Sequence, residues 1–172
     1  MNKAVFFDRD GVINRRIFGG YVTKWEEFEL LSDVAEVLTA VKAKGYLAIV
    51  ITNQRGIGKG LMTEADLSSI HRQLQDHLQT TTSLQFDDIL YCPDADRSSP
   101  RRKPSPAMLL EAGAKWNIDL SQSWIIGDSV SDVEAGRRAG THTAFLITEH
   151  TTEIPQADVI LQKLTDFLPV LN

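Results

Sequence analysis

The amino-acid sequence predicts an α/β fold, a doubly wound parallel sheet with helices on both faces. Short apolar runs alternate along the chain with segments in which apolar residues recur every three or four positions. This alternation is typical of strands joined by helical crossovers, which are right-handed and therefore produce a parallel sheet. A third observation is that polar residues follow several apolar runs directly, at the edge of the sheet where such folds bind ligands.

Six apolar runs are the predicted strands. The first, AVFF at 4–7, is wholly apolar, which indicates a strand buried on both faces. The other runs share its apolar, β-branched or aromatic composition. The predicted strands lie at 4–7, 46–52, 88–92, 123–127, 142–147 and 157–161.

The segments between the strands are predicted helices, which completes a Rossmann-like arrangement. In 32–44 the apolar residues Val34, Val37 and Val41 share one face, and Ser32 is the expected N-cap. The remaining helices are expected from Thr63, from Ser105 as N-cap with Pro106 as the first helical residue, over 130–139, and after 161.

The length and composition indicate a single domain over residues 1–172. The net charge of −5 favours partners other than nucleic acid. We expect no membrane partner and no signal peptide, because the chain has no apolar run of about 18 residues and no apolar leader. The lone cysteine, Cys92, excludes an internal disulfide and favours a reducing, cytoplasmic setting. Nothing in the sequence indicates obligate assembly, so we expect a monomer.

Polar groups follow four of the predicted strands. They are Asp8 and Asp10 after the first strand, Thr52, Asn53, Gln54 and Arg55 after the second, Arg101, Arg102 and Lys103 in the loop after the third, and Asp128 after the fourth. Each group alone has an ordinary explanation, such as a helix cap, a turn or a solvated charge. Their joint position at four strand ends predicts one shared site instead.

The chemistry of these side chains suits phosphoryl transfer. Asp8, Asp10 and Asp128 cannot lie together as anions without a counter-charge, and Mg²⁺ prefers carboxylates together with water and phosphate. Thr52 and Lys103 can hold the phosphoryl oxygens. Asp8 is the candidate nucleophile that forms an aspartyl-phosphate, and Asp10 is the candidate general acid and base.

The four groups resemble the motifs of the haloacid dehalogenase-like (HAD) phosphatases. The matching segments are D-R-D-G-V (8–12), T-N-Q (52–54), R-K-P (102–104) and G-D-x-x-x-D (127–132). The resemblance implies that Mg²⁺ is held by the Asp8 and Asp128 carboxylates and by the backbone carbonyl of Asp10. It also implies that Thr52 and Lys103 bind the transferring phosphate.

Within that family the sequence is similar to the D-glycero-D-manno-heptose 1,7-bisphosphate 7-phosphatases, and it shares much with the related histidinol-phosphate phosphatases. The segments that carry this similarity include F-E-L (28–30), T-N-Q-R-G-I-G-K-G (52–60), Y-C-P (91–93) and R-K-P-S-P-A-M-L-L (102–110). In either case Arg102 and Lys103 would contact the substrate. The motif spacing leaves no room for an inserted cap domain, so we expect a capless enzyme with an open site.

Two features depart from these relatives. They usually hold a structural zinc before R-K-P through three cysteines and a histidine, whereas this loop, 93–101, is short and follows Cys92 alone. We therefore expect no zinc and an ordinary buried thiol at Cys92. Ser129 stands where the heptose enzymes tend to have lysine. Asp132 is either a support for the site or a helix cap paired with Ser129.

Eight basic residues fall in three loops at the predicted active edge, which favours a substrate with a second phosphate. They are Arg9, Arg15, Arg16, Arg55, Lys59, Arg101, Arg102 and Lys103.

The expected function is Mg²⁺-dependent hydrolysis of a small phosphorylated metabolite, with the 7-phosphate of the heptose bisphosphate first and histidinol phosphate as the alternative. Two other classes are a phospho-acceptor signalling module, which shares the sheet and the acidic pocket, and an inactive binding protein. Asp10 distinguishes the enzyme from a signalling module, because an acid beside the nucleophile promotes turnover of the acyl phosphate that a signalling module preserves. The chemical completeness of all four motifs argues against an inactive binding protein.

Overall fold

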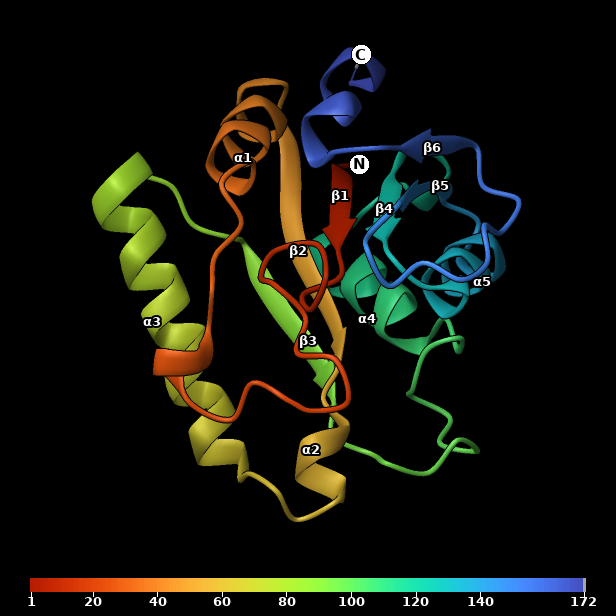
Figure 1. Cartoon of the computed structure of the whole chain (residues 1–172). Coiled ribbons are helices and arrows are strands. Elements are labelled where there is room, and N and C mark those ends of the chain that lie inside the picture. The colour runs from red at the N-terminus through yellow and green to blue at the C-terminus, as the bar shows by residue number, and fades with distance from the viewer. Residues whose placement is uncertain (172) are drawn as a thin grey trace.

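The chain folds around one parallel sheet. The computed structural model describes residues 1–171, so the last residue of the predicted domain 1–172 lies outside the described residues. The strand order is β3-β2-β1-β4-β5-β6 (Figure 1). The strands are β1 (Lys3–Phe7), β2 (Tyr46–Asn53), β3 (Asp88–Cys92), β4 (Trp124–Gly127), β5 (His142–Leu146) and β6 (Val159–Leu161). The predicted doubly wound sheet is confirmed, with strand ends that agree with the prediction to within two residues.

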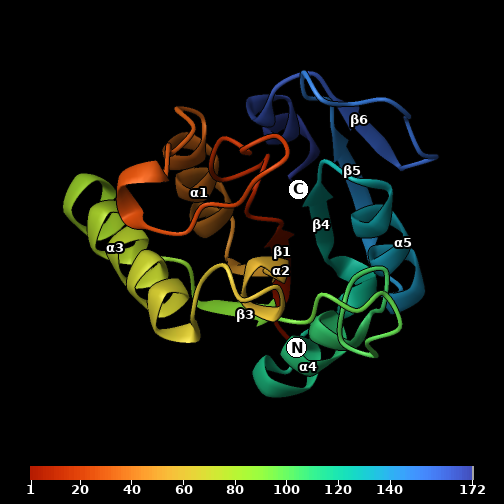
Figure 2. The same cartoon turned by 60° about the horizontal axis from the view of Figure 1, so that its bottom comes forward.

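Helices cover both faces of this sheet. They are α1 (Val34–Ala43), α2 (Arg55–Gly58), α3 (Glu64–Thr82), α4 (Ala107–Trp116) and α5 (Val130–Ala139), with 3-10 turns at Trp25–Glu27, Leu120–Gln122 and Leu164–Val170. In Figures 1 and 2, α1 and α3 lie on one side of the sheet, and α4 and α5 lie on the other.

Alternate residues of the strands build two separate cores. Val5 and Phe7 of β1 pack with the apolar faces of α1 and α3. Ala4 and Phe6, which point to the opposite face, pack with α4 and α5. The apolar run 4–7 within β1 is therefore required by the layered fold, since successive side chains of a strand point to opposite faces.

Two predicted helix starts are wrong by one or two residues. Ser32 does not cap α1, because its hydroxyl contacts Asp33 Oδ1 at 3.2 Å and the Val34 N–H already donates to the Leu31 carbonyl. In α4 the N-cap is Pro106 rather than Ser105, although the Ser105 hydroxyl still accepts from the first helical N–H at 3.2 Å. The helix start predicted at Thr63 is confirmed, and Thr63 is the N-cap of α3.

The last helix and α2 also differ from the prediction. The segment after β6 is a 3-10 helix, Leu164–Val170, with Pro169 inside it. Proline lacks the N–H that an α-helical turn would use at this position. The helix α2 was not predicted, because a single turn is too short to show an apolar period.

The chain order creates a switch point between β1 and β4. The chain builds β1, β2 and β3 outward in one direction, and then returns to β4, β5 and β6 on the other side of β1. Ligands of doubly wound folds bind at the carboxyl ends of the strands beside such a point. Within residues 1–171 no further domain is inserted between the strands, in agreement with the predicted capless form. None of the described helices combines the length and the apolar character that crossing a bilayer requires.

Candidate active site

The first acidic motif lies at the carboxyl end of β1. The backbone N–H of Asp8 donates to the carbonyl of Ile126 at 2.9 Å, which fixes the motif against β4. The chain then turns at Gly11, whose φ of 97° lies in the left-handed region that favours glycine. A Cβ at Gly11 would lie 2.0 Å from Asp128 Oδ2. Only glycine therefore allows this turn to approach Asp128 so closely.

Lys103 joins three elements at the centre of the site. Its Nζ donates to Asp8 Oδ1 at 2.8 Å, to the Ile51 carbonyl at 2.9 Å and to Asp132 Oδ1 at 2.5 Å. The side chain is only 3% exposed. Burial alone would lower the pKa of Lys103, but the charges of Asp132 and Asp8 outweigh burial and raise this pKa above its ordinary value. The lysine is therefore a fixed cation within contact of Asp8.

Asn53 holds the lysine loop against the end of β2. Its Oδ1 accepts from the backbone N–H of Lys103 at 3.1 Å, and its Nδ2 donates to the Lys103 carbonyl at 3.2 Å. Both ends of the Asn53 amide are thus used within the protein. Asn53, one of the predicted site residues, thus positions Lys103.

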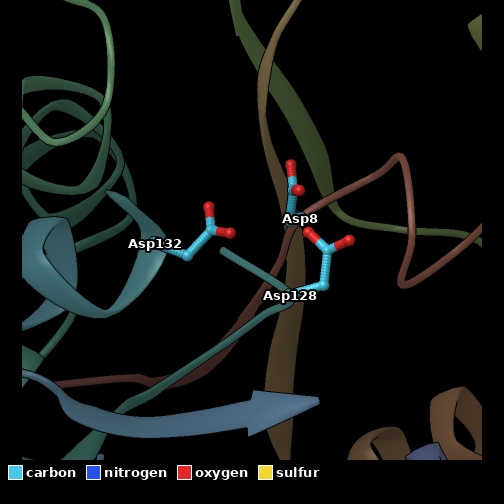
Figure 3. A group of neighbouring side chains, drawn as sticks. All are labelled: Asp8, Asp128 and Asp132. Carbon is cyan, nitrogen blue, oxygen red and sulfur yellow. The ribbon is translucent and has the colours of Figure 1, made fainter. Parts of the chain in front are cut away.

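Three buried acids face one another beside this lysine. Carboxylate oxygens of Asp8, Asp128 and Asp132 lie within 4.8 Å of one another, and Figure 3 shows Asp132 pointing toward the other two. Burial and the charge of Asp132 raise the pKa of Asp8, and burial and the charge of Asp8 raise that of Asp128. The cluster holds more negative charge than its neighbouring cations offset, and this imbalance suits a divalent cation.

Asp132 has both of the roles that the sequence left open. Its Oδ2 accepts from the backbone N–H of Ser129 at 3.1 Å and from its hydroxyl at 2.5 Å, which caps α5. Its Oδ1 contacts Lys103. Gly127 makes this approach possible, because a Cβ there would lie 2.1 Å from Asp132 Cβ.

Asp10 has the opposite electrostatic environment. Its carboxylate accepts hydrogen bonds from Arg9 at 3.0 Å, from Asn14 at 3.0 Å and from Gln54 at 2.9 Å. Burial would raise the pKa of Asp10, but the charge of Arg9 and these hydrogen bonds outweigh burial and lower it. The protein itself therefore holds this carboxylate as an anion.

A buried arginine and histidine lie behind Asp10. The side chain of Arg9 is fully buried, and its Nη1 contacts His71 Nε2 at 3.2 Å. Burial and the Arg9 charge lower the pKa of His71 to about 3, so the imidazole is neutral and accepts the bond from Arg9. Sequence reasoning missed His71, although a polar residue on the apolar face of α3, between Leu67 and Leu74, was a usable signal.

Gln54 connects the second motif to the first. Its Nε2 donates both to Asp10 Oδ2 and to Thr52 Oγ1, each at 2.9 Å. The Thr52 hydroxyl accepts this bond, so its own proton is free for another acceptor. Gln54 thus sets the orientation of two predicted site residues.

A cavity of about 510 Å³ lies over these groups. Its lining includes most of the predicted site residues, which are Asp8, Asp10, Asn53, Gln54, Arg55, Arg102 and Lys103. Thr52 and Asp128 are buried beneath it and are not part of the lining. The loop 17–22 forms another wall, with the exposed side chain of Phe18 and with Tyr21.

The basic residues divide between this cavity and other places. Five of the predicted eight line it, and these are Arg16, Arg55, Lys59, Arg102 and Lys103. The other three do not line it. Arg9 is buried under Asp10, Arg15 pairs with Glu29, and Arg101 pairs with Glu111.

Hydrogen bonds close the short loop 93–101. The hydroxyl of Ser99 donates to Asp94 Oδ2 at 2.5 Å, and the buried Cys92 Sγ lies 3.6 Å from the same oxygen. The buried thiol at Cys92 is thus confirmed, and the absence of zinc stays a prediction. The Ala95 carbonyl of this loop accepts from Arg102 Nη1 at 2.8 Å, so the loop also orients a cavity arginine.

Comparisons with known proteins agree with this geometry. A family model described as HAD-hydrolase-like matches residues 100–167. The chain is 36% identical to D-glycero-alpha-D-manno-heptose-1,7-bisphosphate 7-phosphatase of Burkholderia mallei, over 99% of this chain and 94% of that protein. It is 37% identical to D-glycero-beta-D-manno-heptose-1,7-bisphosphate 7-phosphatase of Helicobacter pylori, over 99% and 98%.

Solved structures agree with the same assignment. The D,D-heptose 1,7-bisphosphate phosphatase from B. bronchiseptica, in complex with magnesium and phosphate, superposes with a TM-score of 0.89 at 25% identity, over 98% of this chain and 97% of that one. A putative HAD-like phosphatase from Mesorhizobium loti superposes with a TM-score of 0.85 at 28% identity, over 99% and 86%. The chain thus belongs to the HAD phosphatases, within the D-glycero-D-manno-heptose-1,7-bisphosphate 7-phosphatase family.

Proposed function

We propose that this phosphatase hydrolyses the 7-phosphate of D-glycero-D-manno-heptose 1,7-bisphosphate in a Mg²⁺-dependent reaction, with Asp8 as nucleophile. The contact of Lys103 Nζ with Asp8 Oδ1 at 2.8 Å carries the proposal. It sets a permanent cation beside an attacking oxygen, in the lining of a cavity of about 510 Å³. Phosphoryl transfer depends mainly on such positioning and charge neutralisation.

In the first half of the reaction an Asp8 oxygen attacks the phosphorus and the bond to the sugar oxygen breaks. The Thr52 hydroxyl donates to a phosphoryl oxygen, and the positive charge of Lys103 beside Asp8 offsets the negative charge of the phosphoryl group. The leaving sugar oxygen takes a proton from Asp10, whose pKa rises when the negative phosphate enters beside it. The product of this half is an aspartyl-phosphate and a free sugar hydroxyl.

In the second half a water molecule attacks the same phosphorus. Asp10 accepts the proton of this water, and the bond between phosphorus and Asp8 breaks. The low pKa of Asp10 in the free protein supports this basic role. The bonds from Arg9, Asn14 and Gln54 keep the carboxylate in place through both halves.

The donor set fits Mg²⁺. The buried carboxylates of Asp8 and Asp128 have raised pKa values because burial and mutual repulsion disfavour their charged forms, and hard divalent cations prefer such oxygens. These two side chains and the backbone carbonyl of Asp10 would hold the ion. When bound, it would supply positive charge to the phosphoryl oxygens.

Two unpartnered arginine atoms support a second phosphate on the substrate. The Nε atoms of Arg55 and Arg102 are buried and have no hydrogen-bond partner within the protein. Both residues line the cavity, and a planar guanidinium suits phosphate. Because the similar enzymes are named for both the alpha and the beta sugar, the proposal covers both anomers.

The same charges disfavour the alternative substrate. Histidinol phosphate carries an ammonium group where a bisphosphate carries its second phosphate, and this cation would meet Arg55 and Arg102. A phospho-acceptor module or an inactive binding protein would not require an Asp10 carboxylate that three hydrogen bonds hold in place. The monomeric state and the cytoplasmic setting stay predictions from the sequence.

A phosphate-release assay tests the proposal. The purified protein is given both heptose 1,7-bisphosphate anomers, histidinol phosphate, fructose 1,6-bisphosphate and a short 3′-phosphorylated oligonucleotide. We expect the highest kcat/KM with a heptose bisphosphate, with loss of turnover in EDTA and in Asp8→Asn. Preference for histidinol phosphate would overturn the substrate assignment, and turnover by Asp8→Asn would overturn the mechanism.

A further inference from the structure

One nitrogen of Arg16 contacts two oxygens of the acidic cluster. Arg16 Nη2 donates to Asp128 Oδ1 at 3.0 Å and to the backbone carbonyl of Asp10 at 3.3 Å. These two atoms come from different strand ends, yet they face the same point in space. They are also two of the three protein groups that the proposed function assigns to Mg²⁺.

The charges around this point explain why a guanidinium lies there. The Asp128 side chain is 1% exposed, and Arg16 is its ion-pair partner. Lys103 donates hydrogen bonds to Asp8 and Asp132, and Arg9 donates to Asp10. Arg16 therefore supplies the positive charge nearest to Asp128.

We propose that Arg16 and the divalent cation compete for Asp128 Oδ1 and the Asp10 carbonyl, so that Arg16 sets the metal affinity of the site. The inference rests on the metal assignment in the proposed function. Two cations cannot share these oxygens closely without strong mutual repulsion. Loading the metal must therefore break both hydrogen bonds of Arg16, and this cost weakens metal binding.

The surroundings allow Arg16 to leave. Its side chain is 37% exposed, and it lines both the cavity over Asp8 and a neighbouring cavity of about 280 Å³. The second cavity is also lined by Glu149, which offers the displaced guanidinium a carboxylate. The first offers it the phosphate of a bound substrate.

The neighbouring residue Arg15 provides a matched control. It carries the same charge one position away, but it is 57% exposed and pairs with Glu29 at 3.0 Å. It makes no hydrogen bond to Asp128 or Asp10. Arg15→Gln therefore removes a positive charge near the site without removing a competitor for its oxygens.

Isothermal titration with Mg²⁺ in the absence of substrate tests the inference. We expect Arg16→Gln to bind Mg²⁺ about tenfold more tightly than the wild type, since hydrogen bonds to a charged group no longer have to break. Arg15→Gln should keep the wild-type dissociation constant. Arg16→Lys keeps the charge but loses the planar donor group, so we expect a smaller gain in Mg²⁺ affinity. This variant also allows the test if Arg16→Gln is unstable.

Thermal unfolding gives a second readout that does not depend on activity. In EDTA, Arg16→Gln should unfold at a lower temperature than the wild type, because the acids lose their nearest cation. Saturating Mg²⁺ should abolish this difference. Equal or weaker Mg²⁺ binding by Arg16→Gln would overturn the inference alone. Absence of Mg²⁺ binding by the wild type would overturn the metal assignment as well.

Discussion

Asp8 and Asp10 lie two residues apart in one turn, yet their pKa values move in opposite directions. Burial and neighbouring acids raise the pKa of Asp8, whereas Arg9 and three hydrogen bonds lower that of Asp10. Arg9 thus offsets the charge of the Asp10 anion, whereas the cluster around Asp8 keeps excess negative charge. The difference supports the proposal that the cluster around Asp8 receives cations and phosphate and that Asp10 acts as the base.

The largest effect is expected from substitution of Lys103, the cation within the Asp8 cluster. Lys103→Met should cost about 3–5 kcal/mol of unfolding free energy, because it leaves buried acids without a partner, and it should abolish phosphatase activity. Lys115 makes a contact of the same length, 2.8 Å, with Asp88 but is 56% exposed. Lys115→Met should cost about 1 kcal/mol or less. Urea unfolding measures both, and equal losses would remove the distinction between a buried and an exposed pair.

The two aspartates should respond oppositely to loss of charge when measured in EDTA. Asp10→Asn leaves the fully buried Arg9 without its carboxylate, and we expect it to cost about 3 kcal/mol of unfolding free energy. Asp8→Asn removes one of three mutually repelling charges, so we expect stability to be unchanged or raised by about 1 kcal/mol. Both variants should lose activity. Similar stability changes in urea unfolding would contradict the electrostatic contrast.

His71, which lies behind Asp10, should make the stability of the protein depend on pH. The pKa of His71 is about 3 in the folded protein and near 6.5 when unfolded, so the unfolded chain takes up the proton first as the pH falls. The contribution of neutral His71 to the unfolding free energy is fully present above about pH 6.5. It is lost progressively below that pH, by about 2 kcal/mol between pH 7 and pH 5. His71→Gln keeps an acceptor for Arg9 and should reduce this loss.

The same helix supplies the control for that measurement. His77 of α3 is exposed, and His77→Gln should keep the wild-type pH profile. An unchanged profile in His71→Gln would show that another group controls acid unfolding.

The smallest expected effect concerns the outer wall of the cavity. Arg102→Gln removes a donor to the proposed second phosphate, and we expect the KM for the bisphosphate to rise about tenfold while kcat is kept. The KM for a heptose 7-monophosphate should change less. Arg101 pairs with Glu111 outside the cavity, so Arg101→Gln should leave both KM values unchanged. Equal effects of the two variants in steady-state kinetics would remove Arg102 from the second-phosphate site.

The sequence predicted what depends on periodicity and strand ends. The strand Asp88–Cys92 and the helix Val130–Ala139 match their predicted ranges, because apolar spacing decides both. The meeting of Asp8, Asp128 and Lys103 also follows from the sequence, since parallel strands bring their carboxyl ends to one edge.

Side-chain direction could not be predicted in this way. Arg9 lies between two cavity acids in the sequence, but its side chain points into the core. There it contacts His71, which belongs to a helix far along the chain. Asn53 was predicted as a member of the site, but its amide contacts with the Lys103 backbone could not be predicted. Such assignments depend on contacts between distant segments, which local spacing does not encode.

Trapping the covalent intermediate tests the central claim most directly. Enzyme quenched in acid during turnover of heptose 1,7-bisphosphate is reduced with borohydride, which converts an aspartyl-phosphate to homoserine, and its peptides are sequenced by mass spectrometry. The account predicts homoserine at position 8. Homoserine at position 128 or 132 instead, or an unmodified Asp8 in enzyme that is turning over, would contradict it.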